Sequence, residues 1–534
     1  GQARYVNLRG ARTSWTTLSF DGINVVSPEG RTSRFDNVPS ALAAQIQARK
    51  AVTPDMPGET LAGNVNIVTR DPFDYDGFDL NLKAGYGRVD LGDGDEIDSS
   101  LVMSNVFADG TFGVLVSGSY YKREMATDNF ETDWEPVDRD ATLPGAAERP
   151  IWAREHENKL YRLTRYNKSG SLRLGWQPSD ENRMFLTSIY TQYRDDELRS
   201  NVKWDLDDRQ SSTPNTPCAS RPNNGTTVSG GASGYADVCT GNTPLRGTIY
   251  GIDFDNNFND LESIESIFTH TLGGDHAVGG WDVAWRLNYT ETKDGSDAPA
   301  LTDYDSGSTR TDRPSIVYDF MFANNHRAEI YRTVLVNGAF ALGPRVTNVE
   351  EFNWPLTQLR RRWGGTESEA YTAKLDLTRE FDFGGRPVEL KFGGMYADRN
   401  KFDEETLFDI RAADIAAAGL PTTFAAIAND EGYLGELPLG YAFRYHESGR
   451  ARALVDQAIA SGRGSFSTER AYDVTETIAA AYVMGTAKFD WGNVIAGARV
   501  ERTTNEGEAP FENGVARAEI DDTLVFPSVH VHWD

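Results

Sequence analysis

The residues best suited to binding a metal ion lie in the acidic run at residues 90–98, DLGDGDEID. Closely spaced carboxylates supply the oxygen ligands that Ca²⁺ prefers. The run lacks the bidentate glutamate that ends a twelve-residue calcium loop, and a charged hairpin accounts for the same residues. A structural Ca²⁺ in the acidic loops and a hairpin without metal therefore both remain open, and no other cofactor is predicted.

Covalent chemistry is not predicted. The sequence has no G-x-S-x-G elbow, P-loop, HExxH or CxxC motif. Paired acids occur throughout so acidic a chain, so they do not mark a glycosidase dyad. The sequence indicates a protein that is not an enzyme.

The two cysteines, Cys218 and Cys239, lie in one stretch rich in Ser, Gly and Asn. In an exported protein they predict a local disulfide, which would contribute roughly 3 kcal/mol in the chain-entropy model. A metal site is a weaker alternative because no histidine lies near either cysteine. In a cytosolic protein the pair would be reduced.

Composition narrows the class of protein. Lys and Arg number 53 against 80 for Asp and Glu, and the net charge of −27 repels nucleic acid. Aromatic residues make up 11% and there are 50 glycines, which is typical of β-rich proteins. No run of eighteen apolar residues exists, which excludes a transmembrane helix but not membrane-spanning strands. The chain opens on GQARYVNLRG without a signal peptide, so we interpret it as a mature or truncated fragment.

From residue 75 onward the sequence predicts long strands. On one of them Tyr371, Ala373 and Leu375 alternate with Thr372 and Lys374, as a two-residue period requires. The predicted strands are residues 77–88, 96–107, 111–125, 158–177, 182–197, 260–272, 281–292, 366–381, 387–400, 472–489, 493–504 and 523–533.

The connections between these strands are alternately short and long. Short turns are predicted at residues 108–110, 178–182, 273–280, 382–387 and 490–493, and polar segments of roughly thirty to seventy residues separate the others. This asymmetry is typical of outer-membrane barrels, whose turns are short on one side and long on the other. One helical stretch is predicted in a long connection, at residues 414–428.

Three motifs near the start of the chain follow one another in order: VNLRG (residues 6–10), LSFDGINVV (18–26) and GNVNIVTR (63–70). Together with the intervening VPSALAAQIQARKAVTPDMPGETLA they resemble the plug domain of TonB-dependent outer-membrane transporters. The resemblance implies an incomplete α+β plug at residues 1–74, with a short helix near residues 40–46. Residues 75–534 would then be an all-β antiparallel transmembrane barrel, with about twelve of the 22 strands of a complete plugged transporter.

The resemblance also implies roles for individual residues. Apical plug loops in this family contact the substrate, and an indole beside polar groups suits a sugar ring. The alternative of Trp15 packing into the plug core is slightly favoured. In the family, plug arginines pair with barrel glutamates and form a latch. The alternative for the arginines is that they are solvated, and the alternative for the glycines and Asp21 is that they only shape turns. The substrate-binding candidates are Trp15, Glu29, Arg31 and Arg34, and the plug-motif and latch candidates are Arg9, Gly10, Asp21, Gly22, Gly63, Asn66 and Arg70.

The implied function is TonB-dependent active transport across the outer membrane of a Gram-negative bacterium. The expected partners are the TonB–ExbB–ExbD complex, outer-membrane lipid and a small-molecule ligand. The motif pattern and aromatic density favour an oligosaccharide, and a ferric siderophore or other metal chelate is the alternative. A passive porin and a secreted β-rich enzyme or adhesin are the competing hypotheses.

Overall fold

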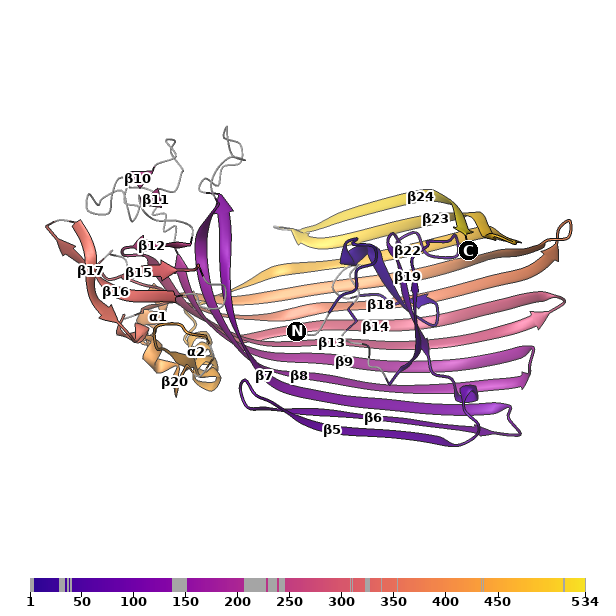
Figure 1. Ribbon diagram of the computed structural model, residues 1–534, viewed down its shortest axis with the longest axis horizontal. Helices are drawn as coiled ribbons and strands as arrows, with labels where there is room; N and C mark the ends of the chain where they lie inside the picture. The colour runs from indigo at the N-terminus through magenta and orange to yellow at the C-terminus, as the bar shows by residue number, and fades with distance from the viewer. Residues whose placement is uncertain are drawn as a thin grey trace.

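Twelve long antiparallel strands form one curved sheet, the main sheet (Figure 1). The computed structural model describes residues 4–27, 34–35, 38, 41–136, 151–205, 227–228, 238–239, 245–307, 309, 311–321, 327–337, 339–352, 354–433, 435, 437–511 and 514–533. The strand order is β24-β23-β22-β19-β18-β14-β13-β9-β8-β7-β6-β5. The strands are β5 (Asp79–Val89), β6 (Gly94–Phe107), β7 (Phe112–Pro136), β8 (Ile151–Ser179), β9 (Asn182–Asp205), β13 (Asp253–Val278), β14 (Trp281–Tyr304), β18 (Leu356–Asp382), β19 (Pro387–Arg411), β22 (Ser465–Phe489), β23 (Gly492–Phe511) and β24 (Gly514–Trp533).

The predicted all-β antiparallel class is confirmed, and each of the twelve predicted strands corresponds to a strand of the main sheet. The predicted strands are too short, because the prediction stopped where apolar alternation stopped. Backbone pairing does not need apolar side chains, so the ladders continue into polar sequence; β8 reaches 29 residues. The turn predicted at residues 273–280 is also too wide, since β13 continues to Val278 and only Gly279 and Gly280 turn.

The short turns at residues 108–111, 180–181, 279–280, 383–386 and 490–491 gather at one end of the main sheet, the turn end. The long connections gather at the other, the cap end, where the short turn at residues 90–93 also lies (Figure 1). Residues 4–74, the N-terminal segment, lie against one face of the sheet, which we call the inner face. They form a four-stranded sheet in the order β2-β1-β4-β3. Its elements are η1 (Thr13–Trp15), β1 (Thr16–Phe20), β2 (Ile23–Asn24), β3 (Ala43–Arg49), β4 (Gly63–Thr69) and η2 (Pro72–Asp74).

The helix predicted near residues 40–46 is wrong, because these residues lead into strand β3. That strand pairs antiparallel with β4, with Ile46 opposite Ile67. Available strand pairing thus overrides the local helical preference of an alanine-rich stretch. The small core of the N-terminal segment includes Leu18, Phe20 and Ile67, and Ile189 of β9 packs into it from the main sheet.

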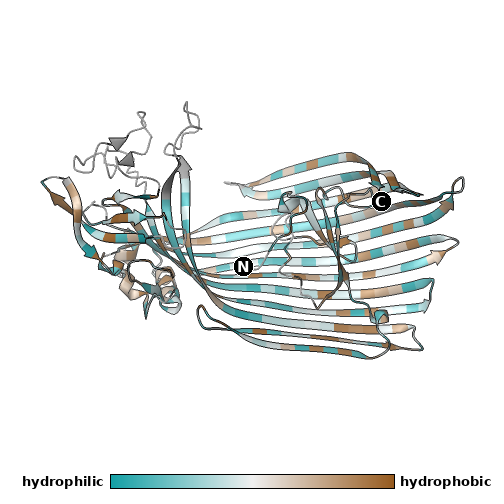
Figure 2. Cartoon of the chain, viewed as in Figure 1, coloured by the Kyte–Doolittle hydropathy of each residue, from teal (hydrophilic) through white to brown (hydrophobic). Residues whose placement is uncertain are grey.

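The opposite face of the main sheet, the outer face, carries an apolar band. On β18 the exposed Tyr371, Leu375 and Phe381 alternate with side chains of the inner face. About ten residues separate Tyr371 from Phe381, or about 33 Å along the strand, which a tilt reduces to the roughly 25 Å of an outer-membrane apolar band. Figure 2 shows hydrophobic and hydrophilic residues alternating along these strands. No helix in the described part of the chain is long and apolar enough to cross a membrane.

The long connections fold into a cap at the cap end. Its elements are β12 (Arg246–Ile249), β15 (Pro314–Asp319), β16 (Arg327–Val336), β17 (Ala339–Val346), η5 (Val349–Glu351), α1 (Ala412–Ala417), η6 (Phe424–Ala426), β20 (Ala428–Gly432), β21 (Arg444–His446) and α2 (Ser448–Ala460). Two short strands, β10 (Thr227–Val228) and β11 (Val238–Cys239), pair in another connection. The helix predicted at residues 414–428 is therefore shorter than expected and divided, and helix α2 was not predicted.

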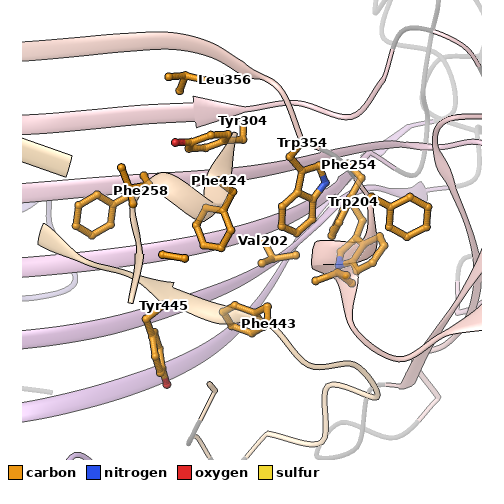
Figure 3. Close-up of a cluster of buried hydrophobic side chains, with 14 of the residues drawn as sticks. Val202, Trp204, Phe254, Phe258, Tyr304, Trp354, Leu356, Phe424, Phe443 and Tyr445 are labelled. Atoms are coloured by element: carbon orange, nitrogen blue, oxygen red, sulfur yellow. The ribbon is translucent and has the colours of Figure 1, made fainter. Parts of the chain in front are cut away.

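An aromatic core holds the cap to the main sheet (Figure 3). Trp204 at the end of β9 stacks on Phe254 of β13, with ring centroids 4.0 Å apart. Trp354 and Phe424 from the cap extend the same cluster. The cap is thus a packed structure rather than a set of independent loops.

His446 in this core makes the cap sensitive to acid. Its ring stacks on Phe258 at 4.8 Å, its Nδ1 lies 3.0 Å from Ser200 Oγ, and burial lowers its pKa to about 3. Below pH 6.5 the unfolded chain binds a proton that the folded chain does not, so stability is full above pH 6.5 and falls towards pH 3. We expect a loss of about 1.4 kcal/mol per pH unit across that window. Thermal melts of the cap should show it, and His446→Gln should flatten the slope; an unchanged slope in that variant would contradict the assignment.

Candidate ligand-binding site

The N-terminal motifs hold one another through a compact set of hydrogen bonds. Asp21, with φ of 48°, accepts from the backbone N–H of Thr69 at 2.9 Å and from its hydroxyl at 2.7 Å. Asn66 Oδ1 accepts from the backbone N–H of Gly22 and from the Ser19 hydroxyl, each at 2.9 Å. The DG turn and the strand GNVNIVT therefore occur together because each satisfies polar groups of the other.

Gly63 fits only because it has no side chain. Its φ is 145°, and an added Cβ would lie 2.4 Å from the carbonyl oxygen of Arg49. We expect Gly63→Ala to destabilise the N-terminal segment by about 2–4 kcal/mol, since backbone strain and a backbone clash add. Limited proteolysis of that segment measures the change. Gly10→Ala is the matched control, because Gly10 also has positive φ but has open space around it; equal effects would contradict the clash.

The predicted arginine latch stays a prediction, because the family's partner glutamates are expected in later strands than those described. Arg70 Nε donates to the Ala41 carbonyl at 2.9 Å, inside the N-terminal segment, and Nη1 donates to the hydroxyl of Tyr75, the residue that directly follows the segment. Arg9, with φ of 57°, and Gly10 form an exposed turn. Among the ion pairs of the described residues, none joins Arg9 or Arg70 to a carboxylate of the main sheet.

Near the turn end the charges are instead reversed, with carboxylates on the N-terminal segment and cations on the main sheet. Arg173 of β8 donates from Nε to Asp71 at 2.8 Å and from Nη1 to Asp21 at 3.1 Å. The same nitrogen donates to Thr69 at 2.8 Å, and Arg183 forms a second ion pair with Asp71. This buried cluster anchors the motif residues to the sheet.

Two further pairs lie along β19, with Lys391 near its turn end and Arg399 farther towards the cap end. Lys391 contacts Asp55 at 2.7 Å. Burial alone would raise the pKa of Asp55, but Lys391 and a hydrogen bond from Thr53 hold it at about 2, so the carboxylate stays charged. Arg399 binds Glu59 through two hydrogen bonds, of 2.9 and 3.0 Å, and Glu476 of β22 through a third, of 3.1 Å.

Two cavities lie between the N-terminal segment and the main sheet, each of about 240 Å³. The lower cavity, nearer the turn end, is lined by Asp21, Asn24, Arg49, Asp55, Asn66, Arg286, Lys374, Asp376 and Lys391, among others. The upper cavity is lined by Ser14, Thr17, Asn24, Val25, Val26, Ser27, Glu59, Ser368, Arg399, Asn400, Lys401, Val474, Glu476 and Asn505.

The upper cavity is the candidate ligand-binding site. Ser368 is 2% exposed, and its hydroxyl makes no hydrogen bond with the described residues. Arg399 and Lys401 supply positive charge, while Glu59 and Glu476 compensate Arg399. An orphaned buried hydroxyl beside cationic groups is an arrangement that a polar ligand or ordered water completes.

The predicted substrate-binding residues have mixed outcomes. Trp15 is 44% exposed and adjoins Ser14 of the upper cavity, so the expectation that it packs into the core is wrong. Arg34 is buried, pairs with Glu265 of β13 at 2.9 Å and lies over the Tyr193 ring, which favours an anchoring role. Glu29 and Arg31 lie outside the described residues.

The predicted disulfide and calcium site remain predictions. Cys218 lies outside the described residues, and only the backbone of Cys239 is described, in β11. In the acidic run, Asp93 pairs with Arg88 and Asp98 with Lys83 across a hairpin. Within the described chain, the group of three carboxylates close enough to share a cation is elsewhere, at Asp253 and Asp255 in the first residues of β13 and Asp305 directly after β14.

Sequence reasoning missed the residues that join the two sheets, namely Asp55, Glu59, Asp71, Arg173, Lys391 and Arg399. A signal was present, since Lys391, Arg399 and Lys401 are an even number of residues apart on one strand and so share a face. Charged residues on the face opposite the apolar alternation indicate a wet interior. Their partners, however, lie hundreds of residues away.

No protein-family model and no curated protein matches the chain. Among solved structures, the siderophore receptor PiuA from Acinetobacter baumannii is 12% identical with a TM-score of 0.46, over 99% of this chain and 56% of that one. The siderophore receptor PirA from Pseudomonas aeruginosa is 8% identical with a TM-score of 0.24, over 96% and 88%. The iron transporter FrpB from Neisseria meningitidis is 7% identical with a TM-score of 0.26, over 98% and 93%.

This chain thus spans about half the length of the first of these proteins. By their names, two are siderophore receptors and one is an iron transporter. The chain is similar to these three structures, and separately its N-terminal motifs resemble the plug of TonB-dependent transporters.

Proposed function

We propose that this chain belongs to an outer-membrane receptor that imports a scarce small solute in a TonB-dependent manner. The observation that carries the proposal is the N-terminal segment, held by buried ion pairs on the inner face of a sheet whose outer face is apolar. A sheet with one apolar and one charged face suits a wall between lipid and a wet interior. A segment tied across that interior suits a regulated entrance better than an open pore.

Energy for such import has to come from elsewhere, because binding alone does not concentrate a solute. The TonB–ExbB–ExbD complex is the energy source that the resemblance implies. Release of the N-terminal segment requires breaking the pairs at Asp55, Glu59 and Asp71, so work done on this segment would act on the entrance directly.

The ligand that best fits the upper cavity is an anionic metal chelate. No aromatic side chain is among the residues described as lining this cavity, so it offers no flat face for a sugar ring. Two cationic side chains line it instead, Arg399 and Lys401. This reverses the sequence-based preference for an oligosaccharide, which stays as the second candidate because exposed Trp15 lies next to the cavity.

Uptake in cells tests the proposal. The full-length protein should fractionate with the outer membrane, and cells that carry it should accumulate radiolabelled iron from a ferric chelate only when TonB is present. Induction by iron starvation but by no glycan would support the chelate. Recovery from the soluble periplasm, or uptake that persists without TonB, would contradict the proposal.

Lys401 provides the sharpest single-residue test of the ligand class. We expect Lys401→Gln to weaken binding of an anionic ferric chelate roughly tenfold to hundredfold, which is the loss of one charge-assisted hydrogen bond. Binding is measured by titration of the purified full-length protein. Lys488→Gln is the control, since Lys488 is exposed at the turn end. Unchanged affinity in Lys401→Gln would favour a neutral ligand such as an oligosaccharide.

A further inference from the structure

We propose that Glu59 is the partition between the upper and lower cavities, and that its release from Arg399 joins them into one polar passage. The passage would run along the seam between the N-terminal segment and strands β14, β18 and β19. This inference rests on the proposed function, because it assigns a route and a gate to the imported solute.

The two cavities share one residue among those that line them. Asn24 lines both of them. Its Nδ2 donates to Glu59 Oε1 at 3.0 Å, and the same carboxylate accepts both hydrogen bonds from Arg399. Beside them Thr17, which lines the upper cavity, contacts Thr60 of the lower cavity at 3.2 Å between hydroxyl oxygens. The boundary is thus built from side chains rather than from a strand.

Glu59 is the exchangeable member of the cluster. Arg399 keeps its ion pair with Glu476 at 3.1 Å when Glu59 leaves, so no cation is left uncompensated inside the sheet. An incoming anion can accept the two guanidinium hydrogen bonds that Glu59 gives up. The ligand and Glu59 therefore compete for the guanidinium group of Arg399, and binding of the ligand there opens the partition.

The lower cavity, like the upper one, is lined by both cationic and anionic side chains. Four cationic side chains and three carboxylates line it, and the cations Arg286, Lys374 and Lys391 come from the main sheet. An anionic solute leaving Arg399 would meet these charges in succession. The anchor between Arg173 and Asp21 lies at the wall of this cavity and not at the partition, so the solute could pass the partition while the N-terminal segment stays seated.

The segment next to Glu59 limits how it can move. Gly58 donates from its backbone N–H to Glu501 of β23 at 3.2 Å, and an added Cβ would lie 2.8 Å from the Phe526 ring. The backbone is therefore held close to the sheet. Opening is expected as a swing of the Glu59 side chain rather than a departure of the whole loop.

Cysteine accessibility tests the partition in the full-length protein in intact cells. Ala284→Cys places a reporter on the wall of the lower cavity, in a background where Cys218 and Cys239 are replaced with serine. A small, membrane-impermeant sulfonated thiosulfonate is added from outside. We expect Glu59→Ala to speed labelling of this reporter at least tenfold, and Asn24→Ala to speed it less.

Two controls separate the partition from general loosening. Asp71→Asn weakens an anchor outside the boundary and should leave labelling within twofold of the parent. A Thr311→Cys reporter, exposed in the cap, should label equally in all backgrounds. Labelling that is unchanged in Glu59→Ala, or that rises as much in Asp71→Asn, would overturn the partition.

The uptake assay and the labelling assay test the proposed function and the partition separately. If Glu59→Ala opens the lower cavity but no chelate is imported, the partition stands and the proposed function falls. If import is TonB-dependent but labelling is insensitive to Glu59, the function stands and the route is wrong. Outer-membrane levels of each variant are compared first, and Asn24→Ala replaces Glu59→Ala if the latter does not assemble.

Discussion

Arg173→Ala is expected to release the N-terminal segment from the main sheet. Arg173 is 6% exposed and holds Asp21 and Asp71, so its removal leaves two carboxylates of the segment without their shared cation. Breaking a buried ion pair by removing one partner costs about 3–5 kcal/mol. Arg183 still contacts Asp71, which places the effect towards the lower end of that range.

The measurement is limited proteolysis of the N-terminal segment in the outer membrane. Losing that much stabilisation raises the fraction of molecules in which the N-terminal segment is detached roughly 10²–10³-fold. The cleavage rate rises by the same factor when opening is fast compared with cleavage. Lys488→Ala serves as the control because its pair with Glu380 is exposed. Should Arg173→Ala cleave at the parental rate, the cluster would not be the anchor.

Trp204→Ala is expected to detach the cap without dissolving the main sheet. The indole is fully buried and stacks on Phe254 (Figure 3). It also meets Tyr441 edge-on, with ring centroids 5.4 Å apart. Removing so large a core side chain costs about 3–5 kcal/mol, through lost burial and the cavity left behind. The cap should therefore unfold at a lower temperature while the main sheet keeps its heat resistance.

Proteolysis of intact cells during a temperature ramp distinguishes the two parts, since the cap is cut at residues outside the membrane band. Trp134→Ala is the matched control: Trp134 is 43% exposed near the end of β7, so its loss should change stability by less than about 0.5 kcal/mol. Simultaneous melting of cap and sheet in Trp204→Ala would show that they form one cooperative unit, contrary to this expectation.

Some features of the fold are set by neighbouring residues and could be predicted from the sequence, whereas others depend on residues far away in the chain. The second half of strand β18 was predictable because Tyr371, Leu375 and Leu377 alternate with polar residues there, and alternation is a property of neighbouring residues. The Asp21 turn was predictable for the same reason. Strand β3 was not, because its conformation depends on Ile67 and Val68 of β4 as partners.

The aromatic residues of the long connections show where local patterns stop. Phe352 and Trp354 lie in a long polar connection of the sequence, yet both are buried in the cap core. No local period distinguishes a folded connection, an interfacial belt and a binding loop, since all three use aromatic side chains. Only packing against β9, β13 and α2 shows which role they have.

The site shows the same division. The resemblance brought the motif residues Asp21, Gly63 and Asn66 to attention, and their hydrogen bonds within the N-terminal segment agree with a shared structural role. It did not identify Glu59 and Arg399, which are 340 residues apart in the chain.

By itself, the sequence determined the β class, the twelve strands and their short turns, because these follow from alternation and turn residues along a few neighbouring positions. The tertiary structure alone decided which charges meet, which aromatic side chains form the cap core and where the cavities lie. These depend on strand registers and on folding the chain back across the sheet. A side chain's face can be read locally, but its partner is set by the whole fold.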